Sequence, residues 1–426
     1  MLLFPLLSNL QRTMYRTPAL VSQMVLLVSL LVGLPAPALS SPDSFEDSTL
    51  TGNIRSYFQS QDFERQADKS AYSLGGKLKL ETGSLKGFKA GTAYYGATDF
   101  DINRDVSGKP NLFPSSIGTF GEVYLQYNNN ATLIRIGRQL VDTPFMNPSD
   151  AHIAPVTFLA YSLVNNSLEN LKFTAMHITE VKRRQNNGFE NTGKFITDRL
   201  GLTPDDTDGA TVLGVKWEKG NLKVQGWEYY YPDFYNLIYI QGDLKFAEVS
   251  GIKPFLSIQA GKQFDIEGSL VGSIDASAFG VKLGAEAGNA NMTYAYNYLP
   301  ENRGNFQNGG FVSPFSYATD ALYTNSLDGG LTSKSSAFVG GAHKWMITYD
   351  FSETIWSKFS YTFFDLIKSA GGKDSKEINI DLMYKFQGIF KGLSLRNRLA
   401  IVVSDRQSEN LIENRIQMQY VFGNLL

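Results

Sequence analysis

The segment that decides the fold stands near the end of the chain, where residues 411–422 read LIENRIQMQYVF. Apolar and polar side chains alternate along it with a period of two, which is typical of an extended strand with two different faces. One face collects Ile412, Asn414, Ile416, Met418, Tyr420 and Phe422, and the other collects Glu413, Arg415, Gln417 and Gln419. The segment therefore predicts a β-strand that lies between an apolar and a polar environment.

The same alternation recurs along most of the chain. From Leu50 onward, no stretch shows a convincing helical period, whereas many segments alternate like strands. Eighteen segments qualify: 50–60, 70–82, 87–99, 119–128, 131–140, 157–165, 170–183, 209–218, 221–230, 233–246, 252–265, 275–287, 290–299, 340–350, 354–366, 375–386, 392–404 and 411–422. We therefore expect an all-β chain with an even number of strands.

Two architectures fit this alternation. In a soluble sandwich the apolar face packs in the core, whereas in an outer-membrane barrel it meets lipid and the polar face lines the lumen. Strand length favours the barrel, because a tilted strand needs about 9–11 residues to cross a bilayer and soluble strands average about 5–6.

The connections between the predicted strands also favour a barrel. Short turns such as 128–130 and 288–291 alternate with much longer connections at 100–118, 141–156, 184–208 and 300–339. Short turns on one rim and long loops on the other are typical of the periplasmic and extracellular ends of outer-membrane barrels. Tyr and Phe residues gather at segment ends, as in the aromatic girdles of such barrels.

Composition excludes several other classes of protein. The 426 residues contain 39 Lys and Arg against 41 Asp and Glu, which argues against a basic nucleic-acid binder. The absence of cysteine excludes disulfides, thiol nucleophiles and Cys-ligated zinc. Mean hydropathy of −0.18 excludes a helical membrane bundle.

The first 40 residues read as a secretory signal. Arg12 and Arg16 precede an apolar run from Ala19 to Leu34, and a small-residue cleavage pattern follows at Ala38 and Ser40. We expect residues 1–40 to be a cleaved Sec-type signal peptide, with Met14 as a second possible start. Residues 41–426 would form a single barrel domain.

Several motifs resemble the OprD-type porins, the substrate-specific outer-membrane channels of Gram-negative bacteria. The resemblance starts at 136–139 (IGRQ), continues through 142–150 (DTPFMNPSD) and 155–158 (PVTF), and extends to 236–246, 322–326, 392–398 and 413–416. It implies an 18-stranded barrel with long extracellular loops partly folded into the lumen. Here Phe422 is followed by four further residues, whereas such barrels often end on an aromatic residue.

Two connections, 141–156 and 300–339, are the best candidates for loops that fold into the lumen and narrow it. Three prolines stiffen the first, and the second has an unusual length for a connection without regular structure. Candidate constriction residues in these loops are Asp150, Asp320, Asp328 and Tyr323.

Arginines at alternating positions are predicted to line the lumen. Arg396 and Arg398 are two residues apart, so they project from the same side of one strand, and Arg415 lies on the polar face of the next. The resemblance implies a basic ladder that includes these three residues and Arg138, although alternation with Ile134 and Ile136 could point Arg138 outward. A guanidinium stays charged and grips a carboxylate in a fork.

These observations predict a porin for passive, substrate-selective diffusion of small nutrients across the bacterial outer membrane, with no metal or other cofactor. The expected solutes bear carboxylates, such as amino acids or aromatic acids. The expected partners are outer-membrane lipid, lipopolysaccharide and the barrel assembly machinery, and no nucleic acid.

Alternatives are a structural or adhesive barrel with a plugged lumen and a barrel hydrolase. An enzyme is disfavoured because His152, His177 and His343 stand in no metal-binding or catalytic motif. The apolar faces suit lipid or another subunit equally, so monomer and trimer both stay open.

Overall fold

The computed structural model describes residues 47–100, 112, 116–149, 152–203, 207–266, 268–315, 320–332, 338–404 and 410–425. The predicted signal peptide at residues 1–40 and the candidate Asp150 lie outside these described residues. Among the described residues, no helix has the length and apolar character needed to cross a membrane.

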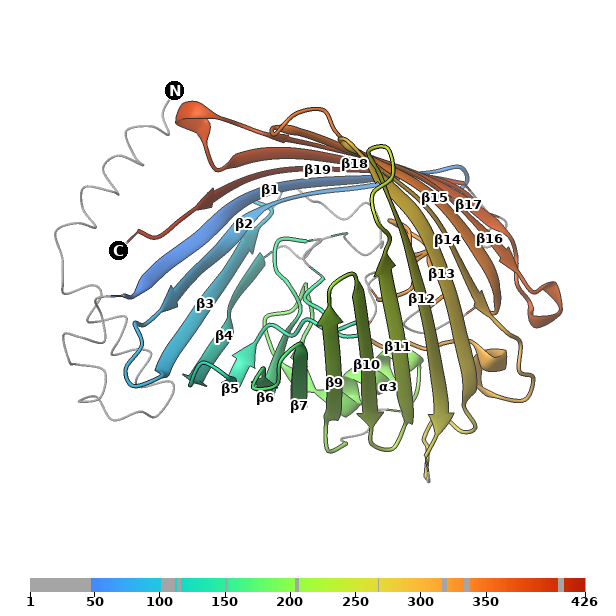
Figure 1. Ribbon diagram of the computed structural model, residues 1–426, viewed down its shortest axis with the longest axis horizontal. Coiled ribbons are helices and arrows are strands. Elements are labelled where there is room, and N and C mark those ends of the chain that lie inside the picture. The colour runs from blue at the N-terminus through green and yellow to red at the C-terminus, as the bar shows by residue number, and fades with distance from the viewer. Residues whose placement is uncertain are drawn as a thin grey trace.

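The described chain forms one sheet in which every strand pairs with its neighbours in antiparallel fashion, as Figure 1 shows. The strands are β1 (Thr49–Phe63), β2 (Lys69–Glu81), β3 (Phe88–Thr98), β4 (Ser116–Asn128), β5 (Thr132–Gln139), β6 (Thr157–Asn165), β7 (Leu171–Lys182), β8 (Glu190–Asn191), β9 (Ala210–Lys219), β10 (Leu222–Tyr231), β11 (Tyr235–Lys245), β12 (Ile252–Asp265), β13 (Asp275–Ala287), β14 (Ala290–Leu299), β15 (Gly340–Asp350), β16 (Ile355–Leu366), β17 (Ser375–Lys385), β18 (Leu393–Ser404) and β19 (Leu411–Phe422). The described residues also form the short 3-10 turns η3 (Phe306–Gly309), η4 (Lys368–Ala370) and η5 (Gly388–Phe390).

The sheet closes on itself because the last strand pairs with the first. The β1–β19 ladder runs without interruption from Gly52 opposite Phe422 to Phe63 opposite Leu411. Closure gives each of the 18 wall strands two neighbours, so the backbone donors and acceptors of the wall pair with one another and do not need water. The predicted closed antiparallel barrel of 18 strands is confirmed; the additional strand, β8, is a two-residue contact with β7 inside the 184–208 connection.

Within the described residues, one helix interrupts the all-β pattern, and the sequence analysis did not predict it. α3 (Thr192–Leu200) lies in the 184–208 connection, and its first turn is capped by the Asn191 side chain, which accepts from the Gly193 and Lys194 amides. Gly201 ends the helix in the left-handed conformation. With nine residues, the helix is too short to give a clear helical period, and its caps were the available signal.

The two rims of the barrel differ in the length of their connections. Short turns join β2 to β3, β4 to β5 and β13 to β14, and β1 begins and β19 ends on this same rim. We call it the short-turn rim. The opposite rim carries the longer connections, including those between β5 and β6, β7 and β9, and β14 and β15.

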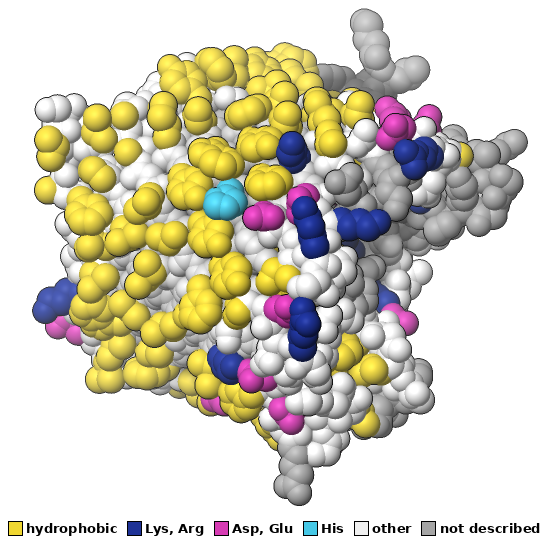
Figure 2. All heavy atoms as spheres, turned by 90° about the vertical axis from the view of Figure 1, so that its right-hand side faces the viewer, with side chains coloured by type: hydrophobic (Ala, Val, Ile, Leu, Met, Phe, Trp, Pro, Cys, Tyr) yellow, Lys and Arg dark blue, Asp and Glu magenta, His cyan; other side chains and the backbone are white. Residues whose placement is uncertain are grey.

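The wall faces outward with apolar side chains and inward with polar ones. In β19 the side chain of Ile412 is 45% exposed, whereas that of Glu413 next to it is 1% exposed. Figure 2 shows apolar side chains spread over much of one outer face, with most charged side chains toward one margin. Exposed apolar residues on the outer face of β12 to β17 include Ile258, Leu283, Met292, Ile347, Phe359 and Ile380. A continuous apolar belt around a closed barrel is the surface that lipid requires.

Two asparagines on the outer face of the barrel, Asn397 and Asn414, form a hydrogen bond with each other. The Asn397 amide nitrogen donates to the Asn414 side-chain oxygen over 2.6 Å. The pairing removes much of the cost of placing two amides on an apolar surface.

Candidate functional site

The inner wall carries three of the predicted arginines side by side. Arg396 and Arg398 lie on β18 and Arg415 on β19, and Arg398 is directly opposite Arg415 in the strand register. Leu395, between the strand start and these arginines, is 41% exposed on the outer face, which fixes the inward side of β18. Paired strands lie about 4.8 Å apart, so the structure brings the three guanidinium groups into one cluster.

Two of the three arginines are paired with carboxylates. Arg396 makes two hydrogen bonds to Asp381, of 2.8 and 2.5 Å, through Nε and Nη2. Arg415 forms an ion pair with Glu413 and also donates to the carbonyl of Leu327 over 3.4 Å. Arg398 forms no ion pair with any carboxylate of the described residues, so it is the ladder arginine whose charge has no partner there.

Three further cations extend this cluster, and the sequence analysis missed them. Lys344 on β15 donates to the carbonyl of Asn325, Lys358 on β16 lies 3.8 Å from Asp381, and Arg55 on β1 donates to Gln419 over 2.7 Å. Each alternates with outward apolar neighbours, for example Lys344 with Trp345, so the period-two pattern was the available signal.

A recess of about 180 Å³ lies among these groups and the loop that faces them. Its lining includes Lys344, Lys358, Arg396, Arg398 and Asp381, together with Asn325 and Ser326 from the β14–β15 connection. Four cationic side chains therefore face a single carboxylate. We call this site the ladder recess, and its charge balance favours an anion.

The β14–β15 connection is fastened along the inner wall. Both carboxyl oxygens of Glu377 on β17 accept backbone amides of the loop, from Asp328 and Gly329, each over 3.0 Å. Ser326 donates to Thr362 over 2.6 Å. These bonds hold the loop tip against strands β16 and β17, beside the ladder recess.

The β5–β6 connection also lies inside the barrel. Phe145 is fully buried, and its ring lies 5.8 Å from that of Tyr229, 5.2 Å from Tyr239 and 5.7 Å from Phe311. Phe311 belongs to the β14–β15 connection, so the two long loops share one apolar cluster. On the other side of the lumen, Arg55 donates to the carbonyl of His152. The loop thus spans from the β10–β11 wall to β1.

The other predicted loop residues have different surroundings. Asp320 is buried and accepts from Asn325 and Thr332, so it organises its own loop. The Lys282 ammonium lies 4.7 Å from the Tyr323 ring centroid. Asp328 contributes its backbone amide to Glu377.

Arg138 does not join the ladder, which corrects its predicted position. In β5 it lies on the same face as Ile136, whose side chain is 48% exposed, and its guanidinium lies 4.4 Å from the Phe189 ring centroid. Alternation decides this placement, because residues two apart share a side. Arg135 is the inward arginine of this strand: it donates to Gln126 over 3.1 and 2.5 Å and lies 4.3 Å from the Tyr124 ring centroid.

Comparisons with known proteins identify the family and agree with the barrel fold. A family model described as outer membrane porin, OprD family, matches residues 116–423. OpdK of Pseudomonas aeruginosa, solved with vanillate, is similar with a TM-score of 0.73 at 17% identity, covering 89% of this chain and 100% of its own. OccAB3 of Acinetobacter baumannii is similar with a TM-score of 0.75 at 17% identity, covering 88% and 99%. OccK9 (OpdG) of P. aeruginosa has a TM-score of 0.74 at 17% identity, covering 89% and 99%. No curated protein sequence matches the chain.

Proposed function

The chain belongs to the OprD family of outer membrane porins, and on that premise we propose that it admits small carboxylate-bearing solutes by passive diffusion. The observation that carries the proposal is the ladder recess. There Arg398, free of any carboxylate partner among the described residues, lies between the neutralised Arg396 and Arg415 with Lys344 and Lys358 nearby.

The mechanism needs only position and charge. A carboxylate that reaches the recess exchanges part of its hydration shell for guanidinium and ammonium donors, which form stronger hydrogen bonds than neutral groups. The two inward loops narrow the path, so a solute passes within reach of these donors. Diffusion continues because a water-lined site holds the anion only weakly.

One structural neighbour offers a parallel for this solute class. OpdK was solved with vanillate, which bears a carboxylate on an aromatic ring. The TM-score of 0.73 at 17% identity supports a shared fold only. Our inference about the solute of this chain therefore rests on the side chains of this chain.

The test replaces Arg398 with Ala in the mature protein and uses Arg138→Ala as a matched control, because Arg138 faces outward. Reversal potentials in planar bilayers and liposome swelling with carboxylates and sugars are measured for both. A charge-assisted hydrogen bond contributes about 1.5–3 kcal/mol, so carboxylate affinity should fall by about 10-fold or more in Arg398→Ala.

The outcomes separate the proposal from its alternatives. Sugar swelling should stay unchanged in both variants, because pore width barely changes. Unchanged anion preference in Arg398→Ala would show that selectivity arises elsewhere. No conductance in the unmodified protein would instead indicate a plugged structural barrel.

A further inference from the structure

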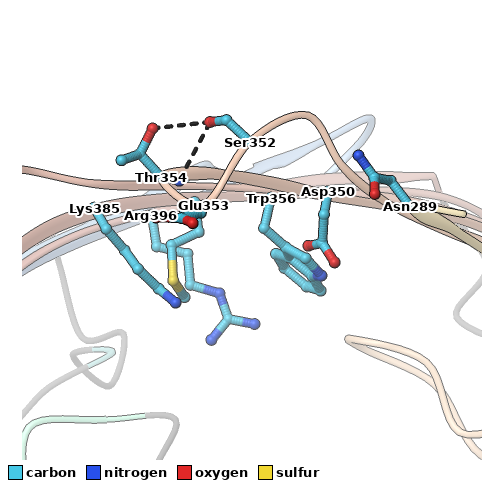
Figure 3. Close-up of a pocket in the computed structure, with 9 residues that line it drawn as sticks. Asn289, Asp350, Ser352, Glu353, Thr354, Trp356, Lys385 and Arg396 are labelled. Carbon is cyan, nitrogen blue, oxygen red and sulfur yellow. Dashed lines mark hydrogen bonds between the residues drawn. The ribbon is translucent and has the colours of Figure 1, made fainter.

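The wall at the short-turn rim between β15 and β18 has two chemically different sides. Figure 3 shows Asp350, Trp356, Lys385 and Arg396 extending from the same side of the sheet, where they line an inner recess of about 700 Å³. Because Arg396 belongs to the ladder on the inner wall, this polar side faces the lumen. The opposite side of the same strand ends continues the outer, apolar face of the barrel.

Two neighbouring turns extend this outer side beyond the strands. The turn 351–354 joins β15 to β16, and the turn 386–392 joins β17 to β18. The Lys385 amide donates to the Thr354 carbonyl over 2.8 Å, so the two turns lie side by side. Apolar side chains gather on and beside these turns, and we call them the rim patch: Tyr349, Phe351, Ile355, Tyr384, Phe386, Ile389 and Phe390.

Three rings in series connect the wall to the tip of the second turn. The Tyr384 ring centroid lies 4.7 Å from that of Phe386, and the Phe386 centroid lies 6.4 Å from that of Phe390. At the tip, Ile389 is 84% exposed. The residues of an aromatic girdle lie at the ends of the strands, whereas Ile389 and Phe390 lie on the turn beyond them.

Other turns of the same rim have a different composition. The turns at 129–130, 220–221 and 288–289 consist of Asn and Gly, which suit a turn in water. A contiguous group of exposed apolar side chains on a turn is unfavourable in water. The rim patch therefore requires a partner that those polar turns do not require.

Continuity with the outer face identifies this partner. Ile347 on β15 and Leu382 on β17 are exposed outward, and the next outward residues toward the rim are Tyr349 and Tyr384 of the rim patch. The patch therefore joins the apolar belt that meets lipid without a polar break. A water-soluble protein would have to enter the edge of the bilayer to cover it. A second barrel packed wall to wall would leave the tip uncovered, because the tip lies beyond the strands.

The turn also carries charge of one sign. Lys391 is exposed, and residues 386–392 include no acidic residue. The acidic Asp350 extends toward the lumen instead (Figure 3). A lysine can lay its apolar stem along a membrane boundary and place its ammonium among phosphate groups.

We propose that the turn 386–392 is an anchor that inserts into the phospholipid leaflet at the short-turn rim. Ile389 and Phe390 lie among the acyl chains, and Lys391 binds the phosphate groups of anionic phospholipid. The anchor fixes the height of the β17 and β18 ends, and hence of the wall sector that carries Arg396 and Arg398. The inference goes beyond the proposed function, because it does not depend on the solute.

The experiment uses the absence of cysteine from the chain, which makes an introduced cysteine the single labelling site. Ile389→Cys receives an environment-sensitive nitrobenzoxadiazole label in the mature protein, reconstituted into phosphatidylcholine vesicles with or without phosphatidylglycerol. Ser84→Cys is the matched control, since Ser84 is an exposed residue of the β2–β3 turn on the same rim. Quenching by nitroxide-bearing lipids and by iodide is measured at both sites, and the heat-dependent gel shift verifies folding.

The label at position 389 should emit at shorter wavelength, be quenched by the nitroxide lipids and be shielded from iodide. The label at position 84 should show the reverse. Adding Lys391→Gln to Ile389→Cys should lower the preference for nitroxide phosphatidylglycerol over nitroxide phosphatidylcholine by about 5-fold at low salt.

Two outcomes would overturn the anchor. Equal access of iodide to both labels would show that the turn lies in water, open to a soluble protein. Shielding from iodide without quenching by nitroxide lipids would show that a second copy covers the turn. An unchanged lipid preference in the Lys391→Gln variant would overturn the phosphate contact. Solute passage could be intact in each of these cases, so the proposed function is tested separately.

Discussion

Glu377 fastens the β14–β15 loop, and replacing it with Gln should loosen the constriction. Its carboxyl oxygens accept the amides of Asp328 and Gly329 at 3.0 Å, and Asn379 donates to the same group over 2.7 Å. Gln keeps the shape but presents an NH₂ group to one of these amides, so at least one charge-assisted bond is lost. That loss is worth about 1.5–3 kcal/mol, which lowers the ratio of anchored to released loop by about 10- to 150-fold.

Single-channel recording measures this ratio directly. Unmodified channels should show a steady current, whereas Glu377→Gln channels should flicker to a larger conductance, with the open fraction rising with temperature. Glu301→Gln is the control, because Glu301 lies in the same connection but pairs with Arg303 at 2.9 Å. Ser326 and Leu327 keep their own bonds to the wall, so the released segment is short. A Glu377→Gln channel as quiet as the unmodified one would refute the claim that this carboxyl group sets the loop position.

Three further predictions follow from the same geometry. Arg398→Lys should retain anion preference but lose the bidentate grip, and the preference should shrink at 1 M salt, where the Debye length is about 3 Å; reversal potentials at both salt concentrations check this. Ile416→Arg or Ile380→Arg should destabilise the folded barrel by about 2–4 kcal/mol if the residue lies near the bilayer midplane. Urea unfolding in detergent measures this change, and unaltered stability of both variants would mean that these faces do not meet lipid. A tag after Arg303 should be labelled on intact cells and one at Asn129 should not, and the reverse pattern would invert the assigned orientation.

The strands were predictable because their environment repeats every two residues. An apolar environment outside the barrel and a polar lumen inside it require an apolar or a polar side chain at each successive position, as Ile412 and Glu413 show. The sequence of a single strand therefore reveals which of its faces points outward. α3 escaped prediction because its start depends on the Asn191 cap and its end on Gly201, not on a periodic face. Its buried Phe195 packs on Phe315, from a distant loop.

The candidate site was only partly predictable for the same reason. Alternation places Arg396, Arg398 and Arg415 inward, and it also points Arg138 outward, where the structure has it. Alternation does not predict which loop residues form hydrogen bonds with which strands. The hydrogen bond that the Asp328 amide donates to Glu377 joins residues 49 positions apart, and nothing local at either residue indicates the other.

The pattern of neutralisation along the ladder has a physical reason. Three bare guanidinium groups on adjacent positions of β18 and β19 would repel one another and hold an anion too tightly for flux. If every arginine had a carboxylate partner, an arriving anion would gain little. Pairing Arg396 with Asp381 and Arg415 with Glu413 leaves Arg398 as the ladder arginine without a carboxylate partner in the described part of the chain, between two orientated neighbours. Under the proposed function, an anion would be attracted at this one point and could then move on to Arg396, so the carboxylates that stabilise the wall would also keep the solute moving.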